Sequence, residues 1–242
     1  MSSKKISTGT VTAIIPAAGS GTRLQSVTGK PKQLTLLHGK PLLVHTLEKF
    51  QECEDIDEII IAARKNDIDL IWESFVEPFG LTKICEIVPG GQNRQESVWA
   101  GVSACSESTE IVTVHDAARI FVTPAVISAS VQTARECGGC VVGIPATDTI
   151  KKVIDKTIDA TIDRSVLWYA QTPQTFQYLL LKRAFKEAMR KKFVGTDEAM
   201  LMEEAGFDVQ MINGSKLNFK ITTPEDLRMA EIILHQTAMR QE

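Results

Sequence analysis

Val11-Thr-Ala-Ile-Ile15, followed by the loop Pro16-Ala-Ala-Gly-Ser-Gly-Thr-Arg-Leu24, is the stretch from which the rest of the chain can be interpreted. The first part is apolar and rich in β-branched residues, which predicts a buried strand. Gly19 and Gly21 have no Cβ and adopt positive φ readily, so consecutive N–H groups can turn inward toward phosphate oxygens. We therefore predict a strand followed by a phosphate-binding loop.

Cationic residues flank this loop. Arg23 ends it, and Lys30-Pro-Lys-Gln33 follows a few residues later. A Walker loop requires Gly-Lys-Ser/Thr, which is absent here, and the dinucleotide fingerprint requires a third glycine where Leu24 stands. The alternative is a simple turn with a solvated arginine, but the preceding strand and the following cations favour phosphate binding.

The loop, Lys30-Pro-Lys-Gln33 and Gly39-Lys-Pro-Leu42 together resemble the nucleotidyltransferases with a glycine-rich N-terminal signature. More narrowly, they resemble the family of 2-C-methyl-D-erythritol 4-phosphate cytidylyltransferases of the non-mevalonate isoprenoid pathway. The similarity extends from residue 11 to about residue 228. It implies transfer of a cytidylyl group from CTP to 2-C-methyl-D-erythritol 4-phosphate with release of pyrophosphate, and Mg²⁺ as cofactor.

Composition is ordinary for a soluble globular protein. The chain has 242 residues, of which 43% are hydrophobic and 24% charged, and its net charge is −3. This gives no basic field for nucleic acid, and no apolar run approaches bilayer-spanning length, so we expect a cytoplasmic protein with no nucleic-acid or membrane partner. The five cysteines indicate reduced thiols, although Cys137-Gly-Gly-Cys140 has the spacing of a redox or metal pair.

Apolar runs alternate with amphipathic stretches along the chain, which predicts an α/β fold. We expect a Rossmann-like three-layer α/β/α architecture, in one domain over residues 1–242, with a mostly parallel sheet and helices on both sides. The predicted strands are Val11–Ile15, Glu58–Ala62, Ile84–Val88, Ile111–His115, Cys140–Ile144, Val209–Ile212 and Phe219–Thr222. The predicted helices are Pro41–Phe50, Asp67–Val76, Arg94–Ala104, Pro124–Glu136, Leu179–Arg190, Asp197–Ala205 and a last helix capped by Thr223.

One segment, about residues 148–163, does not follow this alternation of strands and helices. It alternates polar and β-branched residues and has a probable bend near Asp155-Lys156, which predicts a protruding two-stranded ribbon. An isolated ribbon is only marginally stable in water and needs a partner surface. The resemblance implies that this β-arm joins two subunits into a homodimer; the alternative is a hairpin folded back on its own domain.

Candidate site residues follow the predicted strands, as expected for the ligand-binding edge of a parallel sheet. Asp116 is the natural Mg²⁺ ligand because a carboxylate at a strand end can hold a metal that bridges phosphate oxygens. The pair His115-Asp116 could also suggest a hydrolase triad, but no nucleophile-elbow sequence accompanies it. The resemblance implies nucleotide-binding roles for Pro16, Ala17, Ala18, Gly19, Ser20, Gly21, Gly90, Gly91, Ser97, Ala117 and Lys220.

The remaining site residues depend on the family pattern. The resemblance implies that the acceptor is held by Arg119, Thr149, Arg164, Thr172 and Thr196, with Arg164 reaching across from a partner subunit. It also implies that Lys220 lies near the phosphate of the acceptor. We predict that Arg23 and Lys30 are the catalytic cations that stabilise charge on the reacting phosphorus. Trp168 and Tyr169 are expected to be packing residues.

Three alternative functions stay open at this point. A ribitol 5-phosphate cytidylyltransferase would share the fold and the mechanism, but such relatives tend to begin the loop with glycine where Ala17-Ala18 stand. A molybdopterin or sugar-1-phosphate nucleotidyltransferase would leave the block from Asp163 to Gln174 unexplained. A non-catalytic nucleotide-binding regulatory module would not need Arg23, Lys30, Asp116 and Lys220 together.

Overall fold

The structure is a computed structural model that describes residues 9–19 and 32–239. Ser20, Gly21, Arg23 and Lys30 lie outside the described residues. A seven-stranded sheet runs through the described part in the order β11-β7-β10-β6-β1-β4-β5. Its strands are β1 (Thr10–Pro16), β4 (Glu58–Ala63), β5 (Ile84–Pro89), β6 (Thr109–Val114), β7 (Gly139–Pro145), β10 (Trp168–Gln177) and β11 (Gln210–Asn213).

The sheet is mostly parallel, as the sequence predicted. β1 pairs in parallel with β4 and β6, and the β4–β5 and β7–β11 pairs are also parallel. Only β10 runs antiparallel to its neighbours β6 and β7 within the described sheet.

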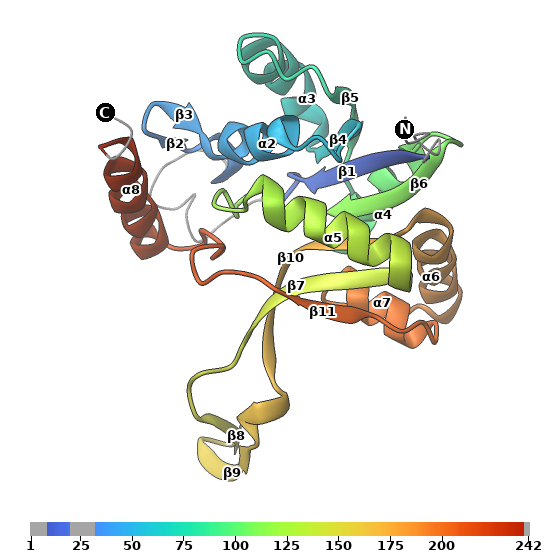
Figure 1. Ribbon diagram of the computed structural model, residues 1–242, viewed down its shortest axis with the longest axis vertical. Coiled ribbons are helices and arrows are strands. Elements are labelled where there is room, and N and C mark those ends of the chain that lie inside the picture. The colour runs from blue at the N-terminus through green and yellow to red at the C-terminus, as the bar shows by residue number, and fades with distance from the viewer. Residues whose placement is uncertain (1–8, 20–31, 240–242) are drawn as a thin grey trace, which may run out of the picture.

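Helices cover both faces of the sheet, which gives the three layers (Figure 1). Alternation along β1 sends Ala13 and Ile15 to one face and Ile14 to the other. The first face packs against α2 (Leu42–Glu52), α3 (Ile68–Ile71) with the π-turn Trp72–Val76, and α5 (Pro124–Cys137). The second packs against α4 (Arg94–Ala104), α6 (Tyr178–Lys191) and α7 (Glu198–Glu204).

The last helix, α8 (Pro224–Ala238), begins as predicted. Thr223 accepts a hydrogen bond from the N–H of Asp226, and the Asp226 carboxylate accepts one from the N–H of Thr223, so the two form a capping box. Leu227, Ala230 and Leu234 pack against the small hairpin of β2 (Leu36–Leu37) and β3 (Lys40–Pro41) and the start of α2. This helix therefore lies beside the carboxyl edge of the sheet, near the candidate site (Figure 1).

The sequence prediction was wrong about two strands. Residues 219–222 form no strand; instead Ile221 N–H donates to the Ala118 carbonyl, which holds this segment across the edge of the sheet. β10 was missed because its core positions are polar. Gln171, Thr172, Gln174 and Thr175 are all buried and hydrogen-bonded, a pattern that hydrophobic periodicity does not detect.

An antiparallel hairpin does occupy the predicted arm. β8 (Ile150–Ile154) pairs with β9 (Thr157–Ile162), and Asp155 and Lys156 form the turn with φ of 46° and 66°. The arm projects away from the body of the chain rather than folding back on it (Figure 1). Trp168 and Tyr169, expected to pack, are instead 37% and 45% exposed at its base.

None of the helices within residues 9–19 and 32–239 combines the length and the apolar character that a bilayer crossing requires.

Candidate active site

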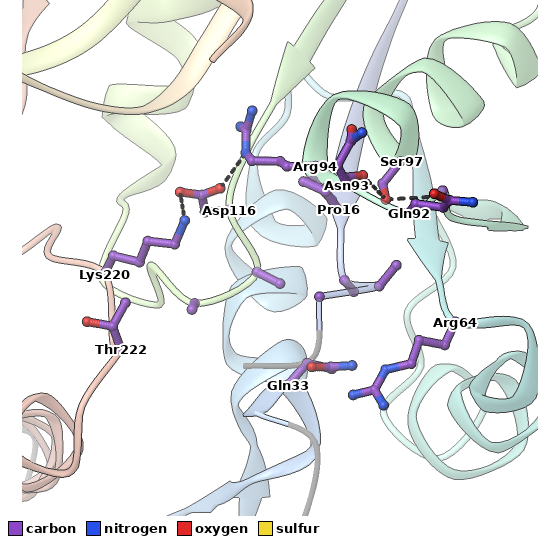
Figure 2. A pocket seen from close by; sticks show the side chains of 16 residues that line it. Pro16, Gln33, Arg64, Gln92, Asn93, Arg94, Ser97, Asp116, Lys220 and Thr222 are labelled. Carbon is purple, nitrogen blue, oxygen red and sulfur yellow. Dashed lines mark hydrogen bonds and ion pairs between the residues drawn. The ribbon is translucent and has the colours of Figure 1, made fainter. Parts of the chain in front are cut away.

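The carboxyl ends of four neighbouring strands carry the loops that build the site. Backbone hydrogen bonds tie these ends together: Ala17 N–H donates to the Ala62 carbonyl at 2.7 Å, and His115 N–H donates to the Ile14 carbonyl at 3.0 Å. The loops enclose a cavity of about 530 Å³ (Figure 2). It is lined by Pro16, Ala17, Ala18, Gly19, Gln33, Arg64, Gly91, Gln92, Asn93, Arg94, Ser97, Asp116, Ala117, Ala118, Lys220 and Thr222.

Most of the predicted nucleotide-binding residues that the structure describes lie on this cavity. Gly90 lies directly behind its wall, and a Cβ there would come 2.5 Å from the Ala18 Cβ and 2.9 Å from the Ser97 Oγ. The absence of a side chain at Gly90 therefore lets two loops from different strands approach each other closely. The nucleotide-contact roles of these residues stay predictions.

The loop after β5 is rigidly held at the start of α4. The Asn93 side chain caps the helix by accepting from the N–H of Glu96 at 2.9 Å. The Ser97 hydroxyl donates to the Asn93 carbonyl at 2.9 Å and accepts from Gly91 N–H at 3.2 Å. The Glu96 carboxylate accepts from Gln92 N–H at 2.9 Å. These bonds give this part of the cavity a preformed shape.

Asp116 is surrounded by cations on one side of the cavity. Its Oδ1 lies 3.1 Å from Arg94 Nε, and its Oδ2 lies 2.9 Å from Lys220 Nζ and 3.4 Å from Arg119 Nε. Burial alone would raise the pKa of Asp116, but the charges of Arg94, Lys220 and Arg119 outweigh it and hold the pKa well below its usual range. Asp116 is therefore a carboxylate at neutral pH.

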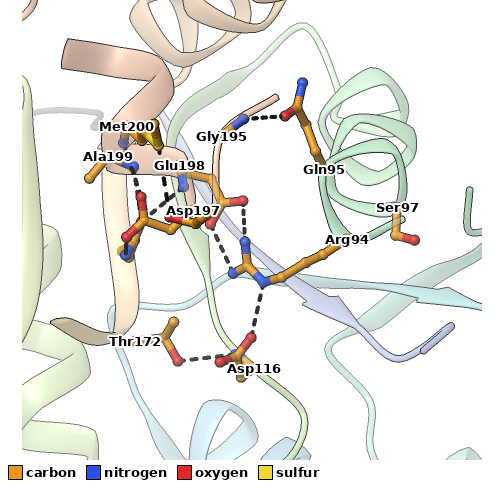
Figure 3. A network of polar contacts seen from close by, with 12 residues as sticks. Arg94, Gln95, Ser97, Asp116, Thr172, Gly195, Asp197, Glu198, Ala199 and Met200 are labelled. Atoms are coloured by element: carbon orange, nitrogen blue, oxygen red, sulfur yellow. Dashed lines mark hydrogen bonds and ion pairs between the residues drawn. The ribbon is translucent and has the colours of Figure 1, made fainter. Parts of the chain in front are cut away.

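Arg94 and Glu198 form a buried pair that the sequence analysis did not identify (Figure 3). Two hydrogen bonds of 2.6 and 2.9 Å join the guanidinium to the carboxylate, and the Glu198 side chain is 1% exposed. Burial raises the pKa of Glu198, against the opposing charge of Arg94. An arginine in the first turn of a helix and a glutamate in the first turn of another carry no sequence signal that they meet.

Two glutamine side chains hold the start of α7 and the segment before it. The side-chain Oε1 of Gln174 accepts from the N–H groups of Glu198 and Ala199 at 3.1 and 3.0 Å. Gln95 Oε1 accepts from Gly195 N–H at 2.9 Å (Figure 3). Thr196, a predicted acceptor contact, lies on this held segment but is exposed and outside the cavity lining.

His115 and Thr172 support Asp116 from inside the protein. The Thr172 Oγ1 accepts from Asp116 N–H at 3.1 Å and lies 3.1 Å from His115 Nδ1. The other ring nitrogen, Nε2, lies 3.0 Å from the Arg119 carbonyl, which can only accept, so Nε2 carries the proton and Nδ1 accepts from Thr172. Burial lowers the pKa of His115 to about 4. Thr172 is thus a buried supporting residue, and its predicted contact with the acceptor stays a prediction.

Gln33 and Arg64 lie on a different side of the cavity and were also missed. Gln33 is 6% exposed, and its Nε2 has no hydrogen-bond partner in the part of the chain that the structure describes. The same holds for Nε and Nη2 of Arg64, which are buried although the side chain is 34% exposed. Figure 2 shows the two side chains pointing toward each other, away from Asp116 and Lys220.

Thr149 and Arg164 are not brought to the cavity within a single chain. Both are exposed at the base of the arm, where Arg164 donates to the Thr147 carbonyl. Arg119 lies closer to the cavity than these two residues. It pairs with Asp116 and donates to the Asn218 carbonyl at 2.8 Å, but it does not line the cavity. A site that includes Thr149 or Arg164 would therefore need a second copy of the chain.

Comparison with known proteins identifies the family. The family model described as "IspD: 2-C-methyl-D-erythritol 4-phosphate cytidylyltransferase" matches residues 11–236. The chain belongs to this family. It is 43% identical over 225 residues to the 2-C-methyl-D-erythritol 4-phosphate cytidylyltransferase of Syntrophus aciditrophicus, covering 93% of this chain and 95% of the relative. The protein of the same name from Clostridioides difficile is 41% identical over 222 residues, which are 92% of each chain.

A solved IspD structure has the same fold. The crystal structure of 4-diphosphocytidyl-2C-methyl-D-erythritol synthase from Anaerococcus prevotii superimposes with a TM-score of 0.83 and 29% identity, covering 94% of this chain and 99% of the other. Every residue that lines the cavity lies within the stretch that the IspD model matches. Because it belongs to the IspD family, the chain is a cytidylyltransferase of the non-mevalonate pathway, as the sequence resemblance predicted.

Proposed function

We propose that this protein transfers the cytidylyl group of CTP to 2-C-methyl-D-erythritol 4-phosphate. The products are 4-diphosphocytidyl-2-C-methyl-D-erythritol and pyrophosphate. The observation that supports this most directly is the cavity, which joins the start of the glycine loop, the rigid Gly91–Ser97 loop and the Asp116–Lys220 pair in a chain of the IspD family.

The chemistry is an in-line displacement at phosphorus. A phosphate oxygen of the acceptor attacks the α-phosphorus of CTP and forms the new P–O bond. The bond between the α-phosphorus and the bridging oxygen breaks, and its electron pair leaves with pyrophosphate. The attacking phosphate is already ionised, so no general base is required. The protein has to position the two phosphates and stabilise charge on the reacting phosphorus.

The described residues divide these tasks between parts of the cavity. The Gly91–Ser97 loop lines the cavity and is fixed by its own hydrogen bonds, and we assign the cytosine ring to it. Lys220 and Arg119 sit beside Asp116 and provide positive charge for the acceptor phosphate. Arg94 holds Asp116 from the opposite direction and is itself held by Glu198, so these cations keep a fixed arrangement before substrate binds.

Mg²⁺ fits the donor chemistry of this site. Asp116 is the single carboxylate among the residues that line the cavity, and no cluster of three or more metal-ligating side chains occurs within residues 9–19 and 32–239. Mg²⁺ commonly binds one carboxylate, several waters and the phosphates of its substrate, so one aspartate is sufficient. When bound, Mg²⁺ would neutralise phosphate charge. We expect chelation by EDTA to abolish turnover and excess Mg²⁺ to restore it.

The β-arm supports a homodimer. Val153, Ile154 and Ile158 on the hairpin are 52%, 53% and 61% exposed, and Trp168 and Tyr169 add exposed aromatic surface at its base. A ribbon with this much apolar surface needs a covering partner. A second copy would cover it and would bring Thr149 and Arg164 to the neighbouring cavity. Sedimentation should give a dimer, and Ile158→Lys should shift it toward monomer with a lower kcat; a monomeric, fully active wild type would disprove this.

The decisive test is pyrophosphate release with each nucleoside triphosphate and Mg²⁺. We expect release only with CTP and 2-C-methyl-D-erythritol 4-phosphate. Release with D-ribitol 5-phosphate instead would keep the mechanism and change the acceptor, while no release with any pair would favour a regulatory nucleotide-binding module. Arg23→Ala and Lys30→Ala should each lower kcat by ~10²–10³ if these residues stabilise the reacting phosphorus.

A further inference from the structure

We infer that Arg64 and Gln33 form the subsite that binds the β- and γ-phosphates of the nucleotide and holds pyrophosphate as it leaves. This inference rests on the proposed function. It assigns a ligand to two residues that were not among the predicted site residues.

The first argument is that these two side chains present donors without acceptors. Gln33 Nε2 and Arg64 Nη2 are buried and find no hydrogen-bond partner within residues 9–19 and 32–239. Leaving a buried donor unsatisfied is costly, so unpaired donors in a cavity wall favour a ligand that supplies acceptors. Both residues line the same cavity, and their side chains point toward each other (Figure 2).

The second argument concerns the charge of the missing partner. A guanidinium has five N–H donors and no acceptor, and an amide nitrogen also only donates. Within the described residues, the carboxylate recorded beside Arg64 is Asp67, whose Oδ2 lies 3.6 Å from Nε, too far for a hydrogen bond. Nη2 stays free of that contact. The ligand must therefore bring several acceptor oxygens, and anionic oxygens match a guanidinium best.

The position of Arg64 at the end of β4 indicates which anionic group of the substrate it binds. Arg64 directly follows β4, which lies next to β1, and the ends of the two strands are joined by the bond from Ala17 N–H to the Ala62 carbonyl. Arg64 thus stands beside the start of the predicted phosphate loop. The predicted acceptor residues lie on the opposite side of β1: Arg119 follows β6, and Thr172 is on β10.

In-line geometry places the acceptor phosphate and the leaving pyrophosphate in different parts of the cavity. The attacking oxygen and the leaving oxygen lie on opposite sides of the reacting phosphorus. If the acceptor phosphate approaches from the side of Asp116 and Lys220, pyrophosphate departs toward the side of β4. Figure 2 places Gln33 and Arg64 away from Asp116 and Lys220, as this arrangement requires.

The test compares ligands that differ only in the phosphates concerned. Calorimetric titration with CTP, CMP and inorganic pyrophosphate, each with Mg²⁺, would be carried out on wild type, Arg64→Gln and Gln33→Ala. Arg64→Gln should weaken CTP and pyrophosphate binding at least about tenfold, the size expected for a charge-assisted hydrogen bond. CMP binding should change less than about twofold, because CMP lacks the β- and γ-phosphates. Gln33→Ala should show the same pattern with a smaller loss.

Two control variants make the result specific. Lys65→Gln removes the same charge from the next residue, which is exposed and does not line the cavity, and should leave all three affinities unchanged. Arg64→Lys keeps the charge and should recover part of the pyrophosphate affinity. A melting curve of each variant would confirm that it is folded.

The outcomes separate this inference from the proposed function. An equal loss of CTP and CMP affinity in Arg64→Gln would overturn the inference, because the residue would then contact the nucleoside. Unchanged CTP and pyrophosphate affinities would overturn it as well. If wild type binds CTP and pyrophosphate but releases no pyrophosphate with the acceptor, the proposed acceptor fails while the subsite is still decided by the variants.

Discussion

On one side of the cavity, Asp116 meets Arg94, Lys220 and Arg119, and Arg94 is in turn paired with the buried Glu198. On the other side, Arg64 and Gln33 present buried donors that lack partners within the described residues. The first group holds itself in place before any ligand arrives, whereas the second, on our inference, awaits the phosphates of a ligand. We therefore expect variants on the two sides to affect unfolding and binding in different proportions.

The strongest test of the comparison is Arg94→Ala. Removing this guanidinium leaves Glu198 buried with no cation recorded beside it among the described residues, and such a loss typically costs ~3–5 kcal/mol. The free energy of unfolding from urea titration would show this change. Arg190→Ala is a matched control, because its pair with Glu187 lies at the surface and its loss should leave the unfolding free energy almost unchanged. Equal effects of the two variants would contradict a structural role for the buried pair.

The second test uses the pH dependence of His115. Burial keeps this ring neutral in the folded protein by lowering its pKa from the ordinary 6.5 to about 4. The unfolded chain gains the proton below about pH 6.5, so the stabilisation is present above that pH and is lost as pH falls toward 4. The loss amounts to ~3 kcal/mol.

A variant isolates this effect from the other histidines. Burial also lowers the pKa of His45, which therefore contributes in the same direction. His115→Asn should flatten the fall in unfolding free energy between pH 6.5 and 4, while His235→Asn, at an exposed position, should not. An unchanged slope in His115→Asn would show that His115 is not the group that takes up the proton.

The third test addresses Lys220, which belongs to the paired side but is less buried. Its side chain is 39% exposed, and Asp116 keeps Arg94 and Arg119 after the lysine is lost. Lys220→Met should therefore lower the free energy of unfolding by only ~1 kcal/mol. Its effect on kcat should be much larger if it contacts a phosphate. A variant with full activity would remove Lys220 from the proposed site.

The smallest expected effect on unfolding belongs to Arg64→Gln. Nη2 has no partner in the described part of the chain, and the ion pair of Nε with Asp67 Oδ2 is long, at 3.6 Å. The substitution should therefore change the unfolding free energy by less than ~0.5 kcal/mol. A large destabilisation would mean that Arg64 has a structural role, and it would erase the difference between the two sides.

Several features could be predicted because their causes are local. The strand β1 follows from the β-branched run Val11–Ile15, and the capped start of α8 follows from Thr223, Pro224 and Asp226. The arm follows from alternating polarity and a two-residue turn at Asp155-Lys156. Each of these signals lies within a few consecutive residues, so no knowledge of the tertiary structure was needed.

Other features could not be predicted because they depend on distant partners. β10 is built from buried polar residues that are tolerated only because each finds a hydrogen bond elsewhere, such as Thr175 with Thr113. Arg94 and Glu198 are 104 residues apart in the chain. The expected strand at residues 219–222 failed because that segment instead crosses the end of the sheet, where Lys220 reaches Asp116.

The sequence by itself determined the α/β class, the order of most elements and the family resemblance, because these are set by local periodicity and by motifs of consecutive residues. The tertiary structure alone decided which charges are paired and which donors are left unpaired. Pairing depends on distances between side chains that come from separate strand ends. Burial also changes the free energy of a charged group far more than the position of that group in the sequence does. The difference between the Asp116 side and the Arg64 side of the cavity is therefore a property of the fold.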